Sequence, residues 1–427
     1  MNSVLSAFSP VRNIKQLFVR PPGNFPVLDG FRALSMLMIL VFHTFAIYAN
    51  HPDSGVTMIQ MVEEGGLWWS WAWNADKSVD IFFVISGFLI SGILLRQIDR
   101  DGKIHMWNFY SRRFLRLSPA YWLAIALYVY LGYSSMDEES RKQLNLQNLW
   151  SNLLYVNNFL PYKEQAMNWT WTLAIEEQFY LLYPLLLVFV MKFRNPERWL
   201  WGLLGLSFVI CFAVIMTDEQ IRTRPGSHIV MDPDFHAHHF SVLYDNLYTR
   251  YGALLCGCLA AFYYFHHEQT TKQFLNSPLG HVLGWLSLIC LAVLMMTPVL
   301  SREFDDWYWG NILYQTFSRN LFSGALSYLI LLCVEKSYMS RVLNLIFANR
   351  IWYPLAQLSY SMYLLHVLPI VMMVSLGVSA MQKYPERYDY THWEAMCILT
   401  LYSTGLTILG ALIFYLLIER PIMNLRK

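Results

Sequence analysis

Charge is scarce in this chain. Only 14% of its 427 residues are Asp, Glu, Lys or Arg, whereas 56% are hydrophobic. Soluble domains carry about 25% charged residues, so this composition excludes an ordinary soluble protein and indicates a membrane protein. The formal net charge is only +2 and no lysine-rich arm or tail is present, which sets nucleic acid aside as a partner.

Cysteine is also sparse and has no recognisable spacing. The six cysteines fall inside or at the edge of apolar runs: Cys211, Cys256, Cys258, Cys290, Cys333 and Cys397. Because paired spacings are missing, we interpret them as small packing residues and expect neither a disulfide framework nor a bound metal. The segment before Pro21 lacks a long apolar stretch, so we expect the first membrane span, and no cleavable signal peptide, to direct insertion.

Long apolar runs dominate what is present. Ten segments approach the length of a transmembrane helix: about 31–50, 79–95, 118–134, 172–191, 199–217, 250–266, 281–300, 318–335, 353–377 and 395–418. The predicted fold is therefore all-α, a polytopic bundle of about ten transmembrane helices. We expect a cytoplasmic N-terminal segment at 1–24, a membrane domain at 25–421 and a short cytoplasmic tail at 422–427.

The distribution of basic residues predicts the orientation of the bundle. With the N-terminus inside, 19 Lys and Arg residues fall in inner segments and 9 in outer loops. Both termini are therefore predicted to be cytoplasmic. The longest outer loops are 51–78, 134–171 and 218–249, and the first two contain tryptophans of the kind that settle at a membrane interface. These loops either recognise a ligand or form interfacial or re-entrant caps over the bundle.

Two ionisable residues interrupt the first apolar run, "FPVLDGFRALSMLMILVFHTF". Arg32 and His43 are eleven residues apart, which places them on one face of a helix and roughly 16 Å apart along its axis. An ionisable side chain inside a membrane normally faces a cavity or a partner because its burial is costly. The alternatives are that Arg32 reaches the inner headgroups or pairs with Asp29, and that His43 is a satisfied core histidine.

Other spans carry titratable groups in their outer halves. Glu176 and Glu177 lie one to two turns below the outer interface in "NWTWTLAIEEQFYLLYP", and His366 lies in the outer half of "LSYSMYLLHVLP". Asp80 opens the second span from the outside in "SVDIFFVISGFLIS". A polar chamber shared by several spans would explain why these titratable residues lie at a similar depth in the membrane. A chance scatter of satisfied polar residues would also produce it.

The inner side carries an arginine cluster in "FYSRRFLRLSPAYW". Arg113 and Arg116 share a helical face, and two guanidinium groups on one face suit phosphate. Positive-inside anchoring against anionic lipid is the competing explanation.

Six strings, in this order, resemble the acyltransferase-3 family of integral membrane O-acyltransferases from residue 25 to residue 421. They are "LDGFRALSMLMILVFH", "VDIFFVISGFLISGILL", "FYSRRFLRLSPAYW", "WTLAIEEQFYLLYP", "LSYSMYLLHVLP" and "IERP". The family's arginine, ten residues, histidine pattern falls on Arg32 and His43, and its RxxR pattern on Arg113 and Arg116. The resemblance implies a multi-pass protein of the bacterial inner membrane that moves acyl groups, usually acetyl from acetyl-CoA, onto surface sugars. Some members carry a fused SGNH-type hydrolase-like domain after the last span, and we expect no such domain in this chain.

The expected chemistry assigns roles to these residues. Acyl transfer from a thioester to an alcohol needs a base, and the neutral imidazole of His43 is our first candidate. Glu176 or Glu177 would hold that imidazole in the required tautomer, as in a triad without its serine. An acyl-histidine intermediate is also chemically possible. His366 is the second candidate for the base or a partner for the acceptor hydroxyl, and Asp80 belongs to the same titratable level.

The donor and acceptor follow from the same assignment. Arg113 and Arg116 would bind the phosphates of acyl-CoA, and Arg32 would accept its pyrophosphate or line the way for the pantetheine arm. The acceptor would be a glycan or lipid-linked sugar, such as lipopolysaccharide O-antigen, capsule or peptidoglycan. Arg250 and Arg319 either hold an anionic acceptor or pair with acids such as Asp245.

The opposing interpretation is a transporter or flippase of a polar solute. Proton relays in membranes also use His and Glu. Against it, the sequence shows no repeat of halves and no matched pair of glycine- or proline-interrupted spans.

Overall fold

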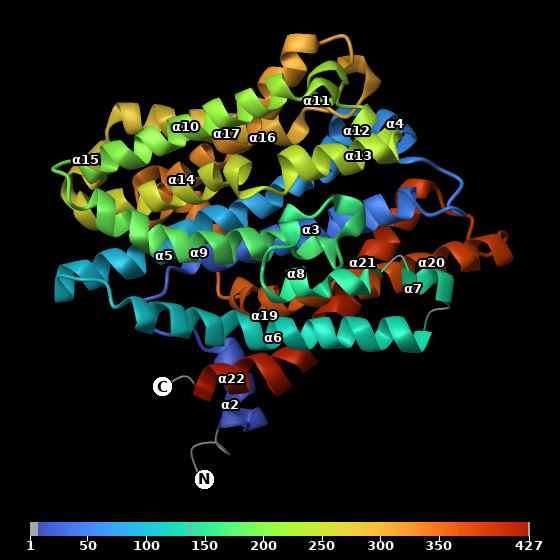
Figure 1. Ribbon diagram of the computed structural model, residues 1–427, viewed down its shortest axis with the longest axis horizontal. Coiled ribbons are helices and arrows are strands. Elements are labelled where there is room, and N and C mark those ends of the chain that lie inside the picture. Colours follow the sequence, from blue (N-terminus) through green and yellow to red (C-terminus); the bar gives the residue numbers. More distant parts are fainter. Residues whose placement is uncertain (1–6, 136–137, 143, 426–427) are drawn as a thin grey trace. The chain divides into compact units, whose positions relative to one another are not determined.

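The computed structural model describes residues 7–135, 138–142 and 144–425. Within these ranges every regular element is helical and there is no strand, which confirms the predicted all-α class (Figure 1). The chain forms two compact units. Unit 1 consists of Met1–Val79, Val293–Glu303 and Leu345–Lys427, and unit 2 consists of Asp80–Ala292 and Phe304–Asn344.

Unit 1 is organised around its first long helix. Its helices are α2 (Pro10–Phe18), α3 (Pro26–Ala49), α4 (Met58–Trp73), α19 (Trp352–Leu365), α20 (Val367–Lys383), α21 (His392–Phe414) and α22 (Arg420–Leu425). Pro26 begins α3, a position where its missing N–H costs no hydrogen bond, and the apolar run then continues to Ala49. α3 lies against α19, α20 and α21. Gly30 permits close contact, because a Cβ there would meet the backbone of Phe347.

The two terminal helices of the described chain lie side by side. Asn424 donates its amide to the side-chain oxygen of Asn13 at 2.8 Å, and Arg420 donates to Gln16 at 2.6 Å. These ends of the chain therefore lie on one side of unit 1. The assignment of that side to the cytoplasm stays a prediction.

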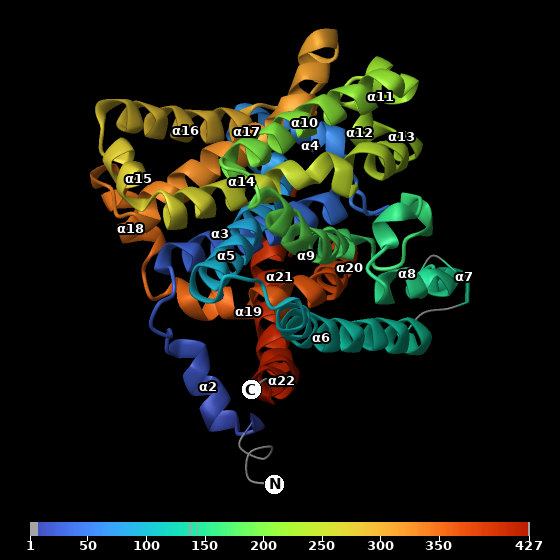
Figure 2. The same ribbon diagram turned by 60° about the vertical axis from the view of Figure 1, so that its left-hand side comes forward.

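Unit 2 contains the remaining helices. They are α5 (Ser78–Asp101), α6 (Met106–Ser135), α7 (Glu138–Lys142), α8 (Leu149–Leu153), α9 (Trp171–Val190), α10 (Pro196–Thr217), α11 (Glu219–Thr223), α12 (His228–Met231), α13 (Pro233–His239), α14 (Leu247–His266), α15 (Glu268–Leu275), α16 (Pro278–Met296), α17 (Tyr308–Val334) and α18 (Arg341–Phe347), the last running on into unit 1. Figure 2 shows α10, α14 and α17 packed together. A π-helical turn, Phe240–Tyr244, follows α13.

Two glycines bring α5 and α14 into close contact. A Cβ on Gly87 would collide with the carbonyl oxygen of Leu254, and a Cβ on Gly257 would collide with that of Val84. Small residues at such crossings let helix backbones approach one another, which is a common packing device in membranes. This contact fixes α14 beside α5 in the interior of unit 2.

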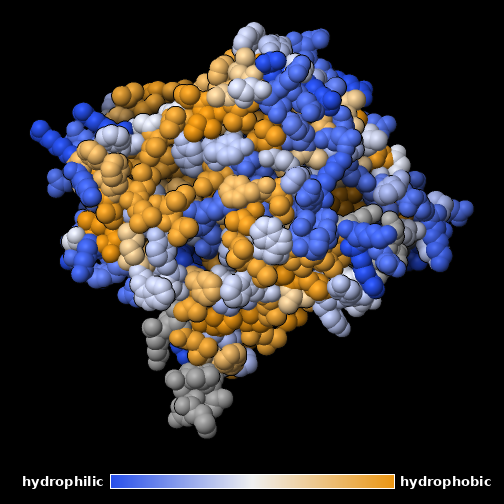
Figure 3. Space-filling view, viewed as in Figure 1, coloured by the Kyte–Doolittle hydropathy of each residue, from blue (hydrophilic) through white to orange (hydrophobic). Residues whose placement is uncertain are grey.

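The count of spans differs from the predicted ten. In the part of the chain that the structure describes, eight helical segments are long and apolar enough to cross a membrane, and the bent pair α19 and α20 would raise the number to nine. α14 is not among the eight, although a span was predicted at 250–266. Most of its residues are buried within the protein, so its surface need not match lipid. By contrast, only 17% of the apolar window of α16 is buried, and hydrophobic residues cover broad patches of the face in Figure 3.

Two segments differ in structure from the loop and the single span that were predicted for them. The outer loop predicted at 51–78 contains the helix α4, which has a non-helical backbone at Gly66. The single span predicted at 353–377 is broken at His366, where α19 and α20 meet at a bend of 69°. At this bend His366 keeps helical dihedral angles, and its N–H and C=O still form hydrogen bonds with Met362 and Ile370.

Candidate active site

Arg32 and His43 lie on one unbroken helix, as the sequence predicts. Because both residues belong to α3, they are separated by roughly 16 Å along the helix axis. Both side chains are half-buried. Arg32 is close enough to Asp29 to interact with its charge, as one alternative held. Asp29 makes its ion pair with Arg20, whose Nε lies 2.8 Å from the carboxylate.

Unit 1 brings His43 together with His366. The two imidazole rings are 4.8 Å apart between centroids and meet edge to face at 71°. His366 is fully buried, whereas His43 is partly exposed. Two residues that are 323 positions apart, 43 and 366, thus form one pair, which the sequence predicts only as a shared level in the membrane.

Backbone carbonyl groups orient both rings. Nδ1 of His43 lies 3.0 Å from the carbonyl oxygen of Ile39, and Nδ1 of His366 lies 2.7 Å from that of Tyr363. A carbonyl oxygen only accepts hydrogen bonds, so the neutral tautomer that fits carries its proton on Nδ1. Nε2 is then the nitrogen that can take a proton. The sequence interpretation assigned this orienting role to a glutamate, and the structure gives Nδ1 of His43 a carbonyl partner.

The break in the helix is part of this geometry. His366 ends α19 and precedes α20, and its Nε2 is a buried atom that makes no hydrogen bond to any residue in the described ranges. A buried polar nitrogen of this kind is costly unless a ligand or water meets it. His366 therefore lies at the bend between two helices and carries an unused proton-accepting atom.

In unit 2, Glu176 is held by two hydroxyl groups. Ser86 of α5 donates to one carboxylate oxygen at 2.7 Å, and Tyr180 donates to the other at 2.9 Å. Sequence reasoning missed both partners. Tyr180 had a usable signal, because a residue four positions after Glu176 lies on the same helical face.

Arg113 lies beside these carboxylates. Its guanidinium stands 5.1 Å from the centre of the Tyr180 ring, and it is close enough to Glu176, Glu177 and Arg116 to interact with their charges. The sequence placed the arginines in an inner layer and the glutamates in an outer layer. The structure brings Arg113 close to Glu176, because its guanidinium lies against the ring of Tyr180, whose hydroxyl donates to Glu176.

The exposure of the arginines supports a shared face. Arg113 and Arg116 are both half-buried, whereas their neighbour Arg112 is exposed. Glu177 has a buried carboxylate oxygen that receives no hydrogen bond from the described residues. Unit 2 thus carries two half-buried cations and two carboxylates next to one aromatic hydroxyl.

Asp80 has a different environment from the one expected. It is fully buried, and its carboxylate lies 3.2 Å from Nη2 of Arg250 and 3.0 Å from Nη1 of Arg319. It is therefore an ion-pair partner, and its place in a titratable chamber is not supported. Asp245, the acid suggested for these arginines, accepts a hydrogen bond from Gln165 at 2.7 Å.

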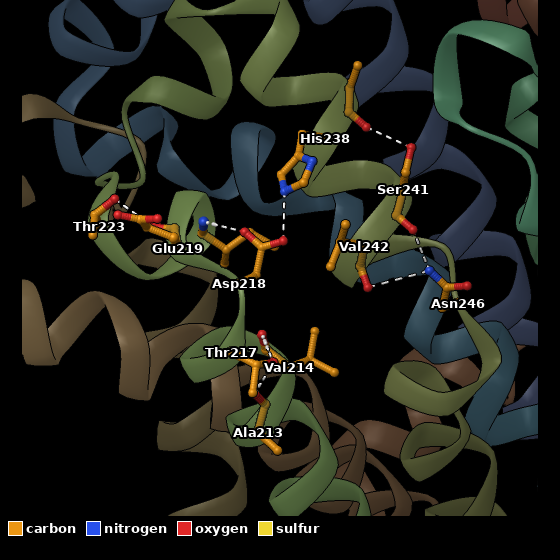
Figure 4. A network of polar contacts seen from close by, with 12 residues as sticks. Ala213, Val214, Thr217, Asp218, Glu219, Thr223, His238, Ser241, Val242 and Asn246 are labelled. Atoms are coloured by element: carbon orange, nitrogen blue, oxygen red, sulfur yellow. Dashed lines mark hydrogen bonds and ion pairs between the residues drawn. The ribbon is translucent and has the colours of Figure 1, made fainter.

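A second polar network lies in the short helices that follow α10 (Figure 4). Asp218 caps α11 by accepting from the backbone of Ile221 at 3.0 Å, and its other oxygen lies 2.8 Å from Nε2 of His238. Because each of these groups has a partner, we assign this network to folding. Among the residues that the structure describes, no group of three or more His, Cys, Asp and Glu side chains is arranged to hold a metal ion.

The apolar helices and the ionisable groups buried among them define an integral membrane protein with a polar centre in each unit. Its family follows from comparison with known proteins. The profile of the acyltransferase-3 family, described as an acyltransferase domain, matches residues 25–416, so the chain belongs to this family. The resemblance seen in the six strings is confirmed.

Curated relatives carry related names. The peptidoglycan O-acetyltransferase OatA of Listeria monocytogenes is 30% identical over 361 residues, which cover 81% of this chain and 49% of that protein. The O-acetyltransferase OatA of Staphylococcus aureus is 26% identical over 367 residues, which cover 83% of this chain and 52% of that protein. The chain thus spans about half the length of these relatives. No solved structure matches it.

Proposed function

We propose that the chain is a membrane O-acyltransferase that moves an acyl group, with acetyl first, from acyl-CoA to a hydroxyl of a surface or exported glycan. Membership of the acyltransferase-3 family supports the reaction class. The observation that carries the proposal is the His43 and His366 pair, in which carbonyl groups hold both Nδ1 atoms and leave Nε2 for proton transfer. The names of the relatives make peptidoglycan the first acceptor to test.

In this mechanism Nε2 of His43 takes the proton of the acceptor hydroxyl as the oxygen attacks the thioester carbonyl. A new ester bond forms, the carbon–sulfur bond breaks, and the coenzyme A thiolate leaves and receives the proton. General-base catalysis of this kind contributes about 10² to 10⁴-fold to the rate. His366 supplies a second imidazole beside the first, where it can accept a hydrogen bond from the acceptor.

Unit 2 supplies binding groups in the same proposal. Arg113 and Arg116 would bind the phosphates of the donor, because guanidinium groups offer paired donors to phosphate oxygens. Glu176 and Glu177 would balance the charge of these arginines before the donor arrives. Arg32 remains assigned to the pantetheine or pyrophosphate part of the donor.

A transporter or flippase is the second candidate, and one observation favours it. Broken helices commonly form substrate sites in transporters, and the bend of 69° at His366 is such a break. Among the described residues it is the one bent pair, whereas alternating-access folds usually contain two that match. Formation of an acylated product separates the two candidates.

The test uses purified full-length protein in nanodiscs with labelled acetyl-CoA and peptidoglycan oligosaccharides. We expect product from the wild type, and a loss of about 10²-fold or more for both His43→Ala and His43→Gln, since glutamine cannot accept the proton. His238→Gln, which alters a histidine bound to Asp218, is the matched control and should retain the rate. Full activity in His43→Gln would remove His43 as the base, and transport without product would favour the second candidate.

A further inference from the structure

The strongest unassigned feature is the cluster of Arg250, Arg319 and Asp80 in unit 2. Two guanidinium groups contact one carboxylate, at 3.2 Å and 3.0 Å, so the three side chains carry two positive charges and one negative charge. Arg250 is almost fully enclosed, with 1% of its side chain exposed, whereas 23% of the Arg319 side chain is exposed. Arg319 is thus the cation of the cluster that a ligand can reach.

Aromatic rings lie against both guanidinium groups, with Tyr244 in contact with each. Tyr244 lies 5.2 Å from the guanidinium of Arg250 and 4.6 Å from that of Arg319, and Trp171 lies 5.2 Å from Arg250. Tyr244 ends the π-helical turn and stacks on Phe240, with ring centres 4.9 Å apart. π-Helical turns occur frequently at functional sites, and aromatic surfaces suit the apolar faces of sugars.

The cluster also stands at a defined distance from the carboxylates of the candidate site. Asp80 and Ser86 are six residues apart on α5, which is about 9 Å along the axis, and Ser86 donates to Glu176. Trp171 and Glu176 are five residues apart on α9, or roughly 8 Å. The two helices therefore give similar spacings, which are comparable with the length of a short oligosaccharide.

A neighbouring carboxyl group reduces the net positive charge of the cluster. Asp245 is close enough to Arg250 to interact with it, and burial raises the pKa of Asp245 to about 7. This carboxyl group is therefore partly protonated at neutral pH and offsets the second positive charge incompletely.

We propose that Arg319, which pairs with Asp80 and stands over Tyr244, is an anion-binding subsite for the acceptor and selects sugars that carry a carboxylate or phosphate group. The inference rests on the proposed acyltransferase function and adds the class of acceptor to it. The bound anion would sit at Arg319, and the sugar would extend along α5 and α9 toward Glu176. Arginine fits this role because it presents paired donors to carboxylate and phosphate oxygens.

The experiment compares acceptors that differ in one charge. The carboxylate probe is the disaccharide of N-acetylglucosamine and N-acetylmuramic acid with a free lactyl carboxylate, and its methyl ester is the neutral counterpart. N-acetylglucosamine 1-phosphate, compared with N-acetylglucosamine, tests phosphate as the source of the charge. Binding is measured by calorimetry without acyl donor, and KM and kcat are measured separately with acetyl-CoA.

We expect the wild type to bind the acid about tenfold more tightly than the ester, and Arg319→Gln to abolish that preference by raising KM for the acid only. Arg319→Lys should keep part of the preference, since it retains the charge without the paired donors. Arg224→Gln is the matched control, because Arg224 also pairs with an aspartate, at 2.7 Å, and stands over a phenylalanine ring. It should bind the acid as the wild type does.

Other outcomes would overturn the inference. Equal weakening of acid and ester in Arg319→Gln, together with a lowered melting temperature, would make the cluster a tie between α5, α14 and α17 only. No preference for either charged probe in the wild type would exclude the subsite while leaving acyl transfer intact. Preference for the acid without any transfer from acetyl-CoA would instead remove the proposed function and leave the anion-binding subsite standing.

Discussion

Single side chains in this protein are oriented by their nearest backbone neighbours. Nδ1 of His43 contacts the carbonyl oxygen four residues earlier, and Nδ1 of His366 contacts the carbonyl oxygen three residues earlier. Each ring is therefore held by its own helix, without a distant carboxylate.

The arginines near Tyr180 lead to a prediction at the scale of the residue. Arg113→Lys and Arg116→Lys should each weaken acetyl-CoA binding by about tenfold, because lysine keeps the charge but loses the planar paired donors. Arg113→Lys also loses the stacking on Tyr180, so its effect should be the larger. Equilibrium binding of labelled acetyl-CoA to the protein in nanodiscs is the measurement.

Arg112→Lys is the matched control, since Arg112 is adjacent in sequence but exposed. All three variants keep the count of inner positive charges, so insertion should be unchanged. Wild-type affinity in both Arg113→Lys and Arg116→Lys would return these residues to lipid anchoring.

At the scale of the element, the crossing of α5 and α14 depends on two glycines. Gly257→Ala should destabilise the protein by about 1 to 3 kcal/mol, because the added methyl group meets the carbonyl oxygen of Val84 in a packed interior. Thermal unfolding in detergent measures the effect. Gly324→Ala in α17 is the control, since nothing lies within 4 Å of a Cβ there and alanine favours the helix. Equal melting temperatures for the two variants would contradict the close crossing.

Most helices could be predicted from the sequence because apolar length is a local property. The placement of Arg32 and His43 on one face, and of Arg113 and Arg116 on another, followed from helical periodicity and is consistent with the structure. The break at His366 could not be predicted in this way, because the apolar run continues across it. Neither could the helix α4, since its tryptophans also suit an interfacial loop.

The partners of the ionisable groups were the hardest part of the site to predict. The sequence placed Asp80, Glu176 and His366 at one level but held no information on which cation or hydroxyl each would meet. Asp80 pairs with arginines of α14 and α17, and Glu176 with a serine of α5. Such contacts depend on the packing of helices distant in sequence, which composition and periodicity do not specify.

At the scale of the whole molecule, Asp245 links stability to pH. Burial raises its pKa to about 7, well above its ordinary value of 3.8, so the folded protein binds this proton more tightly than the unfolded chain does. The contribution to stability is complete below about pH 4 and is lost as the pH rises through about 7. The wild type should therefore lose melting temperature between pH 5 and pH 8, in the absence of acceptor.

Asp245→Asn should reduce the fall in melting temperature between pH 5 and pH 8. Asparagine does not ionise, and it can still accept the hydrogen bond from Gln165. Asp306→Asn, which alters an exposed aspartate, is the control and should follow the wild type. The quantity to compare is the difference in melting temperature between pH 5 and pH 8 in each protein. An unchanged difference in Asp245→Asn would show that other groups cause the pH dependence.

The ion pairs of Asp80 have a consequence for the synthesis of the protein. Arg319 follows Asp80 by 239 residues, so α5 leaves the ribosome long before α17 exists. At about 5 to 20 residues per second the interval is roughly 10 to 50 seconds. During that time the carboxylate of Asp80 needs water, headgroups or the insertion machinery as a temporary neighbour. The two ion pairs of Asp80 are therefore complete only late in translation, after α17 has been made.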